Sequence, residues 1–227
     1  MKILYEDNHV LVAVKPAGIL SQGDASGGAD MLSLLKNYLK EKYHKPRNVF
    51  LGLVHRLDRR VEGVMVFGKT SKAASRLSDA IRKGDFVKEY RALIRGRIAP
   101  PAGELRHYLR KTEKDGRMFS EVCSERDPGA QLAVLDYETI GSRTIMGEEV
   151  TLLRINLLTG RYNQIRAQFA SLGHPLLNDF KYGYRGRDFG DEIGLACIGI
   201  SFPHPTKKET MEFTHFPETG VWKHFKE

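Results

Sequence analysis

The sequence has few cysteines and no long apolar run. Cys123 and Cys197 are the only cysteines among its 227 residues, which is too few for a disulfide framework or a cysteine zinc site. No apolar run approaches the roughly 20 residues that cross a bilayer. Glu6 and Asp7 follow the first apolar residues too closely for a signal peptide. We therefore expect a protein of a reducing compartment, the cytoplasm, with no contact to a membrane.

Metal-binding patterns are also missing. The eight histidines are scattered along the chain, without the paired helical spacing of a zinc site. A metal-dependent hydrolase is thus a weak alternative, and we expect no metal ion and no organic cofactor. Repeats, low-complexity tracts and long Pro/Gly/Ser linkers are absent as well. The sequence therefore predicts a single domain over residues 1–227.

Positive charge is in excess. Lys and Arg number 36 and Asp and Glu number 28, which gives a net charge of +8 at pH 7. A basic protein often binds a polyanion such as nucleic acid, although many basic proteins bind nothing in particular. Hydrophobic residues at 41% and charged residues at 28% are typical of a globular chain and exclude wholesale disorder.

Expected strands outnumber expected helices. Apolar periodicity and capping residues predict helices over 30–43, 71–81 and 163–172. β-prone stretches predict strands over 3–5, 10–14, 63–67, 88–95, 132–139, 149–157, 194–202 and 210–216. The polar segment 98–129 is expected to be irregular. Because several consecutive strands have hairpin-scale connections, we expect the α+β class, with a mixed, mostly antiparallel central sheet flanked by helices and loops.

The segment His55-Arg56-Leu57-Asp58-Arg59-Arg60 places one carboxylate among basic residues, between apolar stretches. Such a run is typical of a loop at the end of a sheet, where reactive groups are often presented. The neighbouring cations favour the ionised form of Asp58, and a carboxylate can act as a nucleophile or a base. The alternative is a surface loop with an ordinary ion pair.

Two further segments combine aromatic and basic residues. In the helix expected from residue 163, Arg166 lies beside an apolar face, where a buried arginine would need a bidentate carboxylate partner. Arg161 precedes this helix, and free backbone N–H groups at a helix start suit a phosphate. Tyr90 lies between Lys88 and Arg91 on a strand, a pattern that suits base stacking but also a tyrosine packed into a sheet.

Taken in this order, the segments resemble the RluA family of pseudouridine synthases over nearly the whole chain. The resemblance rests on motifs at matching spacing, namely Lys15-Pro16-Ala17-Gly18, His55-Arg56-Leu57-Asp58, Lys88-Glu89-Tyr90-Arg91-Ala92, Gly160-Arg161 with Gln164-Ile165-Arg166, and Gly173-His174-Pro175-Leu176. It implies the pseudouridine synthase fold and a catalytic domain without the N-terminal S4 RNA-binding domain that family members often carry.

The resemblance also implies an activity and a set of site residues. The activity is isomerisation of uridine to pseudouridine within RNA. Asp58 matches the catalytic aspartate, Arg166 the arginine that pairs with it, and Tyr90 the tyrosine that stacks on the base. The residues expected at the substrate are His55, Arg56, Arg59, Arg161, Gln164 and Leu195. The catalytic aspartate acts either by direct attack on the sugar or by helping to form a glycal.

Four departures from the family pattern bear on the substrate more than on the chemistry. They are Val61-Glu62-Gly63 for Thr-Ser-Gly, Tyr162-Asn163 for Thr-His, Asn178-Asp179 for Gly-Asp, and Ala196-Cys197 for His-Ala. Glu62 is expected to exclude a phosphate from its position.

The favoured hypothesis is a monomeric synthase that acts on structured RNA without an obligate protein partner, with rRNA slightly ahead of tRNA. The alternative is a non-catalytic RNA-binding or ribosome-assembly protein on a synthase scaffold.

Overall fold

The computed structural model describes residues 2–24, 27–207 and 209–225. The chain forms two compact units. Unit 1 comprises the described residues of Met1–Lys88 and Cys197–Pro217, and unit 2 those of Glu89–Ala196 and Glu218–Glu227. The sequence predicts a single catalytic domain over residues 1–227. Whether the two units act as one such domain stays a prediction.

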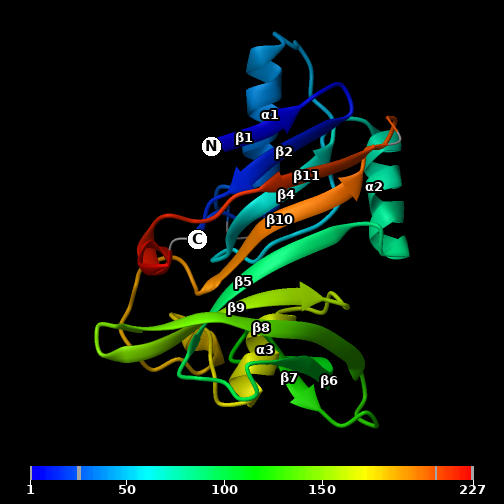
Figure 1. Ribbon diagram of the computed structural model, residues 1–227. Helices are drawn as coiled ribbons and strands as arrows, with labels where there is room; N and C mark the ends of the chain where they lie inside the picture. Colours follow the sequence, from blue (N-terminus) through cyan, green and yellow to red (C-terminus); the bar gives the residue numbers. More distant parts are fainter. Residues whose placement is uncertain (1, 25–26, 208, 226–227) are drawn as a thin grey trace. The chain divides into compact units, whose positions relative to one another are not determined.

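The strands of unit 1 lie side by side in the order β1-β2-β4-β10 (Figure 1). Short β3 pairs with β4, and β11 pairs with β10. The central strands are buried and mostly apolar, as in β2, where residues 10–14 are apolar and Lys15 is the one charged residue. The bounds are β1 (Lys2–Glu6), β2 (Val10–Lys15), β3 (Gly52–Leu53), β4 (Glu62–Gly68), β10 (Leu195–Pro203) and β11 (Thr210–Thr214).

Two helices of unit 1 begin at side-chain caps, as the sequence predicts. Helix α1 (Met31–Lys42) begins after Asp30, whose carboxylate accepts the backbone N–H of Ser33. Helix α2 (Ser71–Lys83) begins after Thr70, whose hydroxyl accepts the N–H of Ala73. Each helix buries one apolar stripe and leaves its basic residues outside, so burial of that stripe attaches it to the unit.

Unit 2 contains a second set of strands, in the order β5-β9-β8-β6-β7, in which each neighbouring pair is antiparallel. Helix α3 packs against β7 and β6. The bounds are β5 (Val87–Arg95), β6 (Ala102–Lys114), β7 (Arg117–Cys123), β8 (Gln131–Ile145), β9 (Glu148–Leu157), α3 (Gln164–Ser171), and the 3-10 helices η1 (Phe180–Tyr182) and η2 (Gly220–His224). The expected α+β class with a mostly antiparallel sheet is confirmed.

The expectation of an irregular segment over 98–129 is wrong. This segment forms the hairpin β6–β7, which turns at Asp115-Gly116 with φ values of 52° and 70°. Most of its side chains face solvent, and Leu105, Leu109 and Ser120 are its buried residues. With so few buried side chains the hairpin lacks the alternation of apolar and polar residues that predicts a strand, although Asp-Gly is a strong hairpin signal.

No helix in the described part of the chain is both long enough and apolar enough to span a membrane.

Candidate active site

Asp58 lies in a loop of unit 1, residues 54–61, which joins β3 to β4. The backbone of this loop is clamped by a buried serine from 36 residues upstream. The hydroxyl of Ser21 accepts the N–H of Leu57 at 2.9 Å and donates to the carbonyl of Leu57 at 2.8 Å. Past Asp58 the chain turns, and its carbonyl accepts the N–H of Val61 at 3.0 Å. Asp58 therefore sits between a fixed peptide unit and a closed turn.

Lys15 supports the same loop from the core. Its side chain is fully buried, and Nζ donates to the carbonyls of Pro16, Ile19 and Arg59 at 2.9, 2.8 and 3.1 Å. Burial lowers the pKa of Lys15 to about 7, against the charges of Asp58 and Glu62, which raise it. The lysine of the Lys-Pro-Ala-Gly motif thus ties the opening strands to the candidate catalytic loop.

Replacement of Lys15 by methionine tests this buried ammonium through the pH dependence of stability. Between pH 7 and 10.5 the unfolded chain keeps the proton that folded Lys15 has released. The free energy of unfolding of the wild type is therefore expected to rise relative to Lys15→Met, by up to about 1.4 kcal/mol per pH unit. Urea unfolding at pH 7, 8 and 9 measures the difference.

Lys40→Met is the matched control, because Lys40 is exposed on α1. Its difference from the wild type should stay constant over the same pH range. If the wild type and Lys15→Met instead change in parallel, Lys15 keeps its proton and the proposed burial effect is absent.

His55 is buried rather than presented to solvent. Its Nε2 accepts the N–H of Val66 on β4 at 3.1 Å, and its ring lies 5.2 Å from that of Phe86. Burial, followed by the nearby charge of Lys88, lowers the pKa of His55 to about 3, so the ring is neutral at pH 7. The structure gives His55 the task of attaching the loop to β4, and its predicted contact with RNA stays a prediction.

The two arginines of the loop differ from His55 in exposure. Arg56 and Arg59 are exposed. Nε of Arg59 donates to the carbonyl of Gly18 at 2.9 Å, and the N–H of Gly18 donates to the carbonyl of Arg59 at 2.8 Å. This reciprocal pair fixes the guanidinium of Arg59 beside Gly18, so Arg59 presents its positive charge at a defined place.

Glu62, a departure from the family pattern, has a partner in the structure. Its Oε1 lies 2.8 Å from Nε2 of His215, and both side chains are largely buried. The next residue must be glycine, because a Cβ at Gly63 would lie 2.6 Å from Cβ of Cys197 on β10. The close approach of β4 to β10 thus explains the glycine, while Glu62 is held beside β11 by His215.

Arg166 of unit 2 lies on α3 and is buried. Its Nε and Nη2 each donate to one carboxylate oxygen of Asp179, both at 2.7 Å. The guanidinium also lies over the ring of Tyr182, 4.8 Å from the centroid. A bidentate carboxylate therefore accompanies the buried Arg166, and within unit 2 this partner is Asp179, whereas the predicted pairing of Arg166 with Asp58 stays a prediction.

Asp179 and Tyr182 were not predicted as site residues. Tyr182 is held by two donors, the N–H of Ser120 at 2.8 Å and the amide of Asn163 at 3.1 Å. Asp179 follows Asn178, whose φ of 64° is left-handed, a region that glycine and asparagine adopt most easily. The change from Gly-Asp to Asn178-Asp179 thus keeps a residue that adopts the left-handed backbone, and it keeps the carboxylate of Asp179. The retained carboxylate in this motif is the sequence signal that could have revealed Asp179.

Gln164 uses its polar atoms inside unit 2. Its Oε1 accepts from the hydroxyl of Thr159 at 2.8 Å and from the N–H of Arg161 at 3.0 Å, and Nε2 donates to Val134 at 3.1 Å. Gln164 therefore shapes the start of α3, and its predicted RNA contact stays a prediction. Arg161 is exposed, and its Nε donates to the carbonyl of Leu132 at 2.8 Å.

The other two predicted residues of unit 2 lie on buried strands. Tyr90 is on β5, where it is paired in register with Ile155 on β9, and it is 6% exposed. Leu195 begins β10, whose first two residues belong to unit 2 and whose other residues belong to unit 1, and it is likewise 6% exposed. Asp58 belongs to unit 1, whereas Tyr90, Arg166 and Leu195 belong to unit 2. Among the described residues, no group of three or more His, Cys, Asp or Glu side chains could hold a metal ion.

Comparison with known proteins defines the class of enzyme. The family model described as RNA pseudouridylate synthase matches residues 9–171. An uncharacterized RNA pseudouridine synthase of Aquifex aeolicus is 31% identical over 96% of this chain and 70% of its own length. Ribosomal large subunit pseudouridine synthase D of Vibrio cholerae is 32% identical over 96% of this chain and 67% of its own.

A solved structure agrees in fold. Human RNA pseudouridylate synthase domain containing 4 superposes with a TM-score of 0.75 at 23% identity, over 94% of this chain and 87% of that chain. The chain therefore belongs to the RluA-type RNA pseudouridine synthases, which are isomerases that act on RNA.

Proposed function

We propose that the protein isomerises specific uridines in structured RNA, with rRNA favoured over tRNA, and that Asp58 is its catalytic aspartate. Two curated relatives carry ribosomal large subunit synthase names, which supports rRNA. A cytoplasmic location and a monomer without an obligate protein partner belong to the same proposal.

The observation that carries the proposal is the construction of the Asp58 loop. Buried Lys15, Ser21 and His55 hold backbone or strand atoms on both sides of Asp58. A surface ion pair does not need such support, because exposed pairs contribute little to stability. A catalytic carboxylate does need it, because its position relative to the substrate must be kept within about 0.5 Å.

Tyr90 and Arg166 are proposed to serve the same reaction. A phenol ring suits stacking on the uracil, and the buried guanidinium of Arg166 suits a carboxylate partner. Arg56, Arg59 and Arg161 are exposed cations that suit RNA phosphates. His55 and Gln164 fit the proposal as residues that hold the loop and the start of α3.

The reaction conserves atoms. The bond from C1′ to N1 of the uridine breaks, and N1 gains a proton. The uracil turns, a bond forms from C1′ to C5, and C5 loses its hydrogen as a proton. Asp58 acts as a nucleophile at the sugar or as a base on the glycal route. The uridine must first leave its stack, which costs a few kcal/mol that cationic and aromatic contacts offset.

Release of tritium from C5 tests the proposal. RNA labelled with tritium at uridine C5 is prepared from cells that lack this gene, and rRNA and tRNA fractions are incubated with the wild-type protein. We expect tritium to appear in water from the rRNA fraction, because C5 must lose its hydrogen. Sequencing of the treated RNA then locates the uridine.

Two results would contradict the proposal in different ways. Release from tRNA alone would overturn the preference for rRNA and keep the chemistry. Tight binding of both RNAs without any release would favour the non-catalytic RNA-binding alternative.

A further inference from the structure

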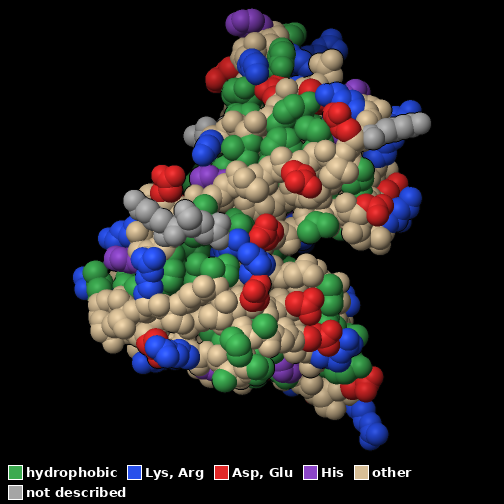
Figure 2. Space-filling view, viewed as in Figure 1, with side chains coloured by type: hydrophobic (Ala, Val, Ile, Leu, Met, Phe, Trp, Pro, Cys, Tyr) green, Lys and Arg blue, Asp and Glu red, His purple; other side chains and the backbone are tan. Residues whose placement is uncertain are grey.

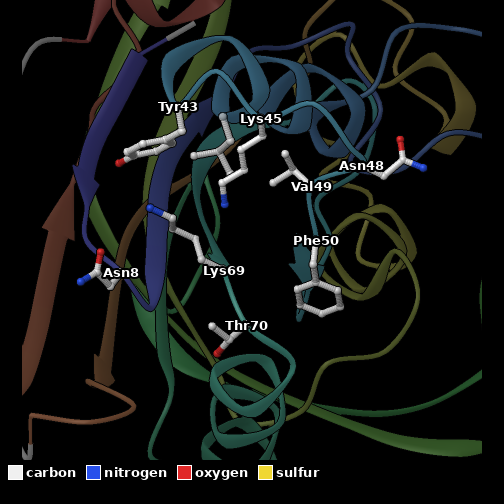
Figure 3. A pocket seen from close by; sticks show the side chains of 9 residues that line it. Asn8, Tyr43, Lys45, Asn48, Val49, Phe50, Lys69 and Thr70 are labelled. Atoms are coloured by element: carbon white, nitrogen blue, oxygen red, sulfur yellow. The ribbon is translucent and has the colours of Figure 1, made fainter.

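Unit 1 has a surface cavity at the opposite end of β4 from the Asp58 loop, because that loop precedes β4 whereas Lys69 and Thr70 of the cavity follow it. It has a volume of about 350 Å³, at the lower end of the range for small-molecule clefts. It is lined by side chains from the turn between β1 and β2, the end of α1, the segment that follows α1, and the two residues between β4 and α2, namely Asn8, Leu39, Tyr43, Lys45, Asn48, Val49, Phe50, Lys69 and Thr70 (Figure 3). The lining includes the two aromatic side chains of Tyr43 and Phe50 and the two ammonium groups of Lys45 and Lys69.

Phe50 forms a supported aromatic surface in this cavity. Its side chain is 51% exposed, so burial in the core does not account for its position. The ring lies against Gly52, because a Cβ added there would approach Cζ and Cε1 of Phe50 at 3.4 and 3.5 Å. An aromatic ring held by the protein and open to solvent can stack on a base of any sequence.

The lysines of the cavity differ in their partners. Glu6 accepts from Lys42 and Lys69, both at 2.8 Å, and from the hydroxyl of Tyr43 at 2.6 Å. Burial would raise the pKa of Glu6, but these hydrogen bonds outweigh it and lower the pKa to about 2. Lys69 is thus neutralised by a carboxylate. In the part of the chain that the structure describes, Lys45 forms no salt bridge, and its Nζ lies 5.9 Å from the ring of Tyr43.

The arrangement of the side chains limits what the cavity can recognise. Figure 3 shows the Lys45 side chain extending into the open space between Tyr43, Lys69 and Phe50, whereas the amide of Asn48 points away. The surroundings are basic, since Lys40, Lys42, Lys45 and Arg47 fall within eight residues. Figure 2 shows basic side chains at this end of unit 1, over α1.

We infer that this cavity binds one unpaired nucleotide of the RNA, with the base stacked on Phe50 and its phosphate at Lys45. The inference rests on the proposed function for the identity of the ligand. The two contacts assigned to the nucleotide, a ring face and an ammonium group, use features that every nucleotide carries, so we expect the site to tolerate any base. It acts as a second hold on the RNA, away from the uridine that reacts.

Binding of short single strands tests the cavity directly. The probes are fluorescein-labelled hexauridylate and hexaadenylate, measured by fluorescence anisotropy. Phe50→Ala is expected to weaken both probes by roughly 5- to 150-fold, the effect of losing one stacked base. Lys45→Ala is expected to lower the slope of log affinity against log salt by about 0.7, the effect of one phosphate contact to a single strand.

Two matched variants control for size and charge. Leu34→Ala removes an exposed apolar side chain from α1, and Lys83→Ala removes an exposed lysine from the far end of α2. Both should leave the affinity and the salt slope unchanged. In tritium release, Phe50→Ala should raise KM and leave kcat unchanged, because the cavity does not touch the reacting uridine.

The outcomes separate this inference from the proposed function. If Phe50→Ala and Lys45→Ala bind and react like the wild type while tritium is released, the inference is overturned and the proposed function stands. If these variants lose oligonucleotide binding but no protein releases tritium, the nucleotide site stands and the proposed activity is overturned. A preference of more than tenfold for one homopolymer would contradict base-tolerant stacking.

Discussion

Replacement of Asp58 by asparagine is expected to abolish tritium release, with a fall in kcat of at least about a thousandfold. Asparagine keeps the shape of the side chain and loses the charge that a nucleophile or base requires. The loop should remain folded, because Lys15 and Ser21 hold its backbone and His55 attaches it to β4, and none of these three bonds uses the Asp58 carboxylate. RNA affinity should therefore be retained or rise slightly, since one negative charge is removed from a site for a polyanion.

The control for this variant is Asp85→Asn, an exposed aspartate of unit 1 that follows α2. It should leave both kcat and RNA affinity unchanged. Single-turnover tritium release with saturating enzyme separates chemistry from binding. Turnover by Asp58→Asn within tenfold of the wild type would show that Asp58 is not the catalytic aspartate.

The second large effect concerns the buried pair of Arg166 and Asp179. Asp179→Ala is expected to destabilise the protein by about 3–5 kcal/mol, because it removes the bidentate partner of a buried guanidinium. The pair Arg154–Glu138 provides the control, since its side chains are about half exposed at a separation of 2.8 Å. Glu138→Ala should cost less than about 1 kcal/mol. Urea unfolding measures both.

A double variant then separates stability from catalysis. Arg166→Met with Asp179→Leu replaces the ion pair by apolar side chains of similar volume, an exchange that is often neutral or stabilising. Its free energy of unfolding should return to within about 1 kcal/mol of the wild type. Tritium release should not return, because the guanidinium proposed to serve the reaction is gone. Recovery of both would assign Arg166 a purely structural task.

Much of the fold follows from short-range patterns. The caps at Asp30 and Thr70 and the apolar stripes of α1 and α2 depend on residues three or four positions apart, so the sequence predicts these helices to within two residues. The apolar runs of β2 and β4 are equally local. The hairpin β6–β7 was missed because its polar faces lack that pattern, and the Asp115-Gly116 turn was its only strong local signal.

Part of the candidate site can also be predicted from local sequence, and part of it cannot. The motif His55-Arg56-Leu57-Asp58 and the arginine of α3 are visible in the sequence, because they are unusual residues in a fixed order. The residues that hold them in place cannot be identified from the sequence. Ser21 reaches Leu57 across 36 residues, and Asp179 reaches Arg166 across 13 residues through an irregular segment. No periodicity links such positions.

The sequence by itself determined the family, the reaction expected of it and the side chains that could perform it, because these depend on residue types in order. Only the tertiary structure decided which of them are buried and what holds them. It placed His55 and Gln164 inside as supports, paired Arg166 with Asp179, and left Lys45 and Phe50 open at the surface of unit 1. Burial and hydrogen bonding depend on contacts between segments that are distant in the sequence, and local sequence patterns do not predict such contacts.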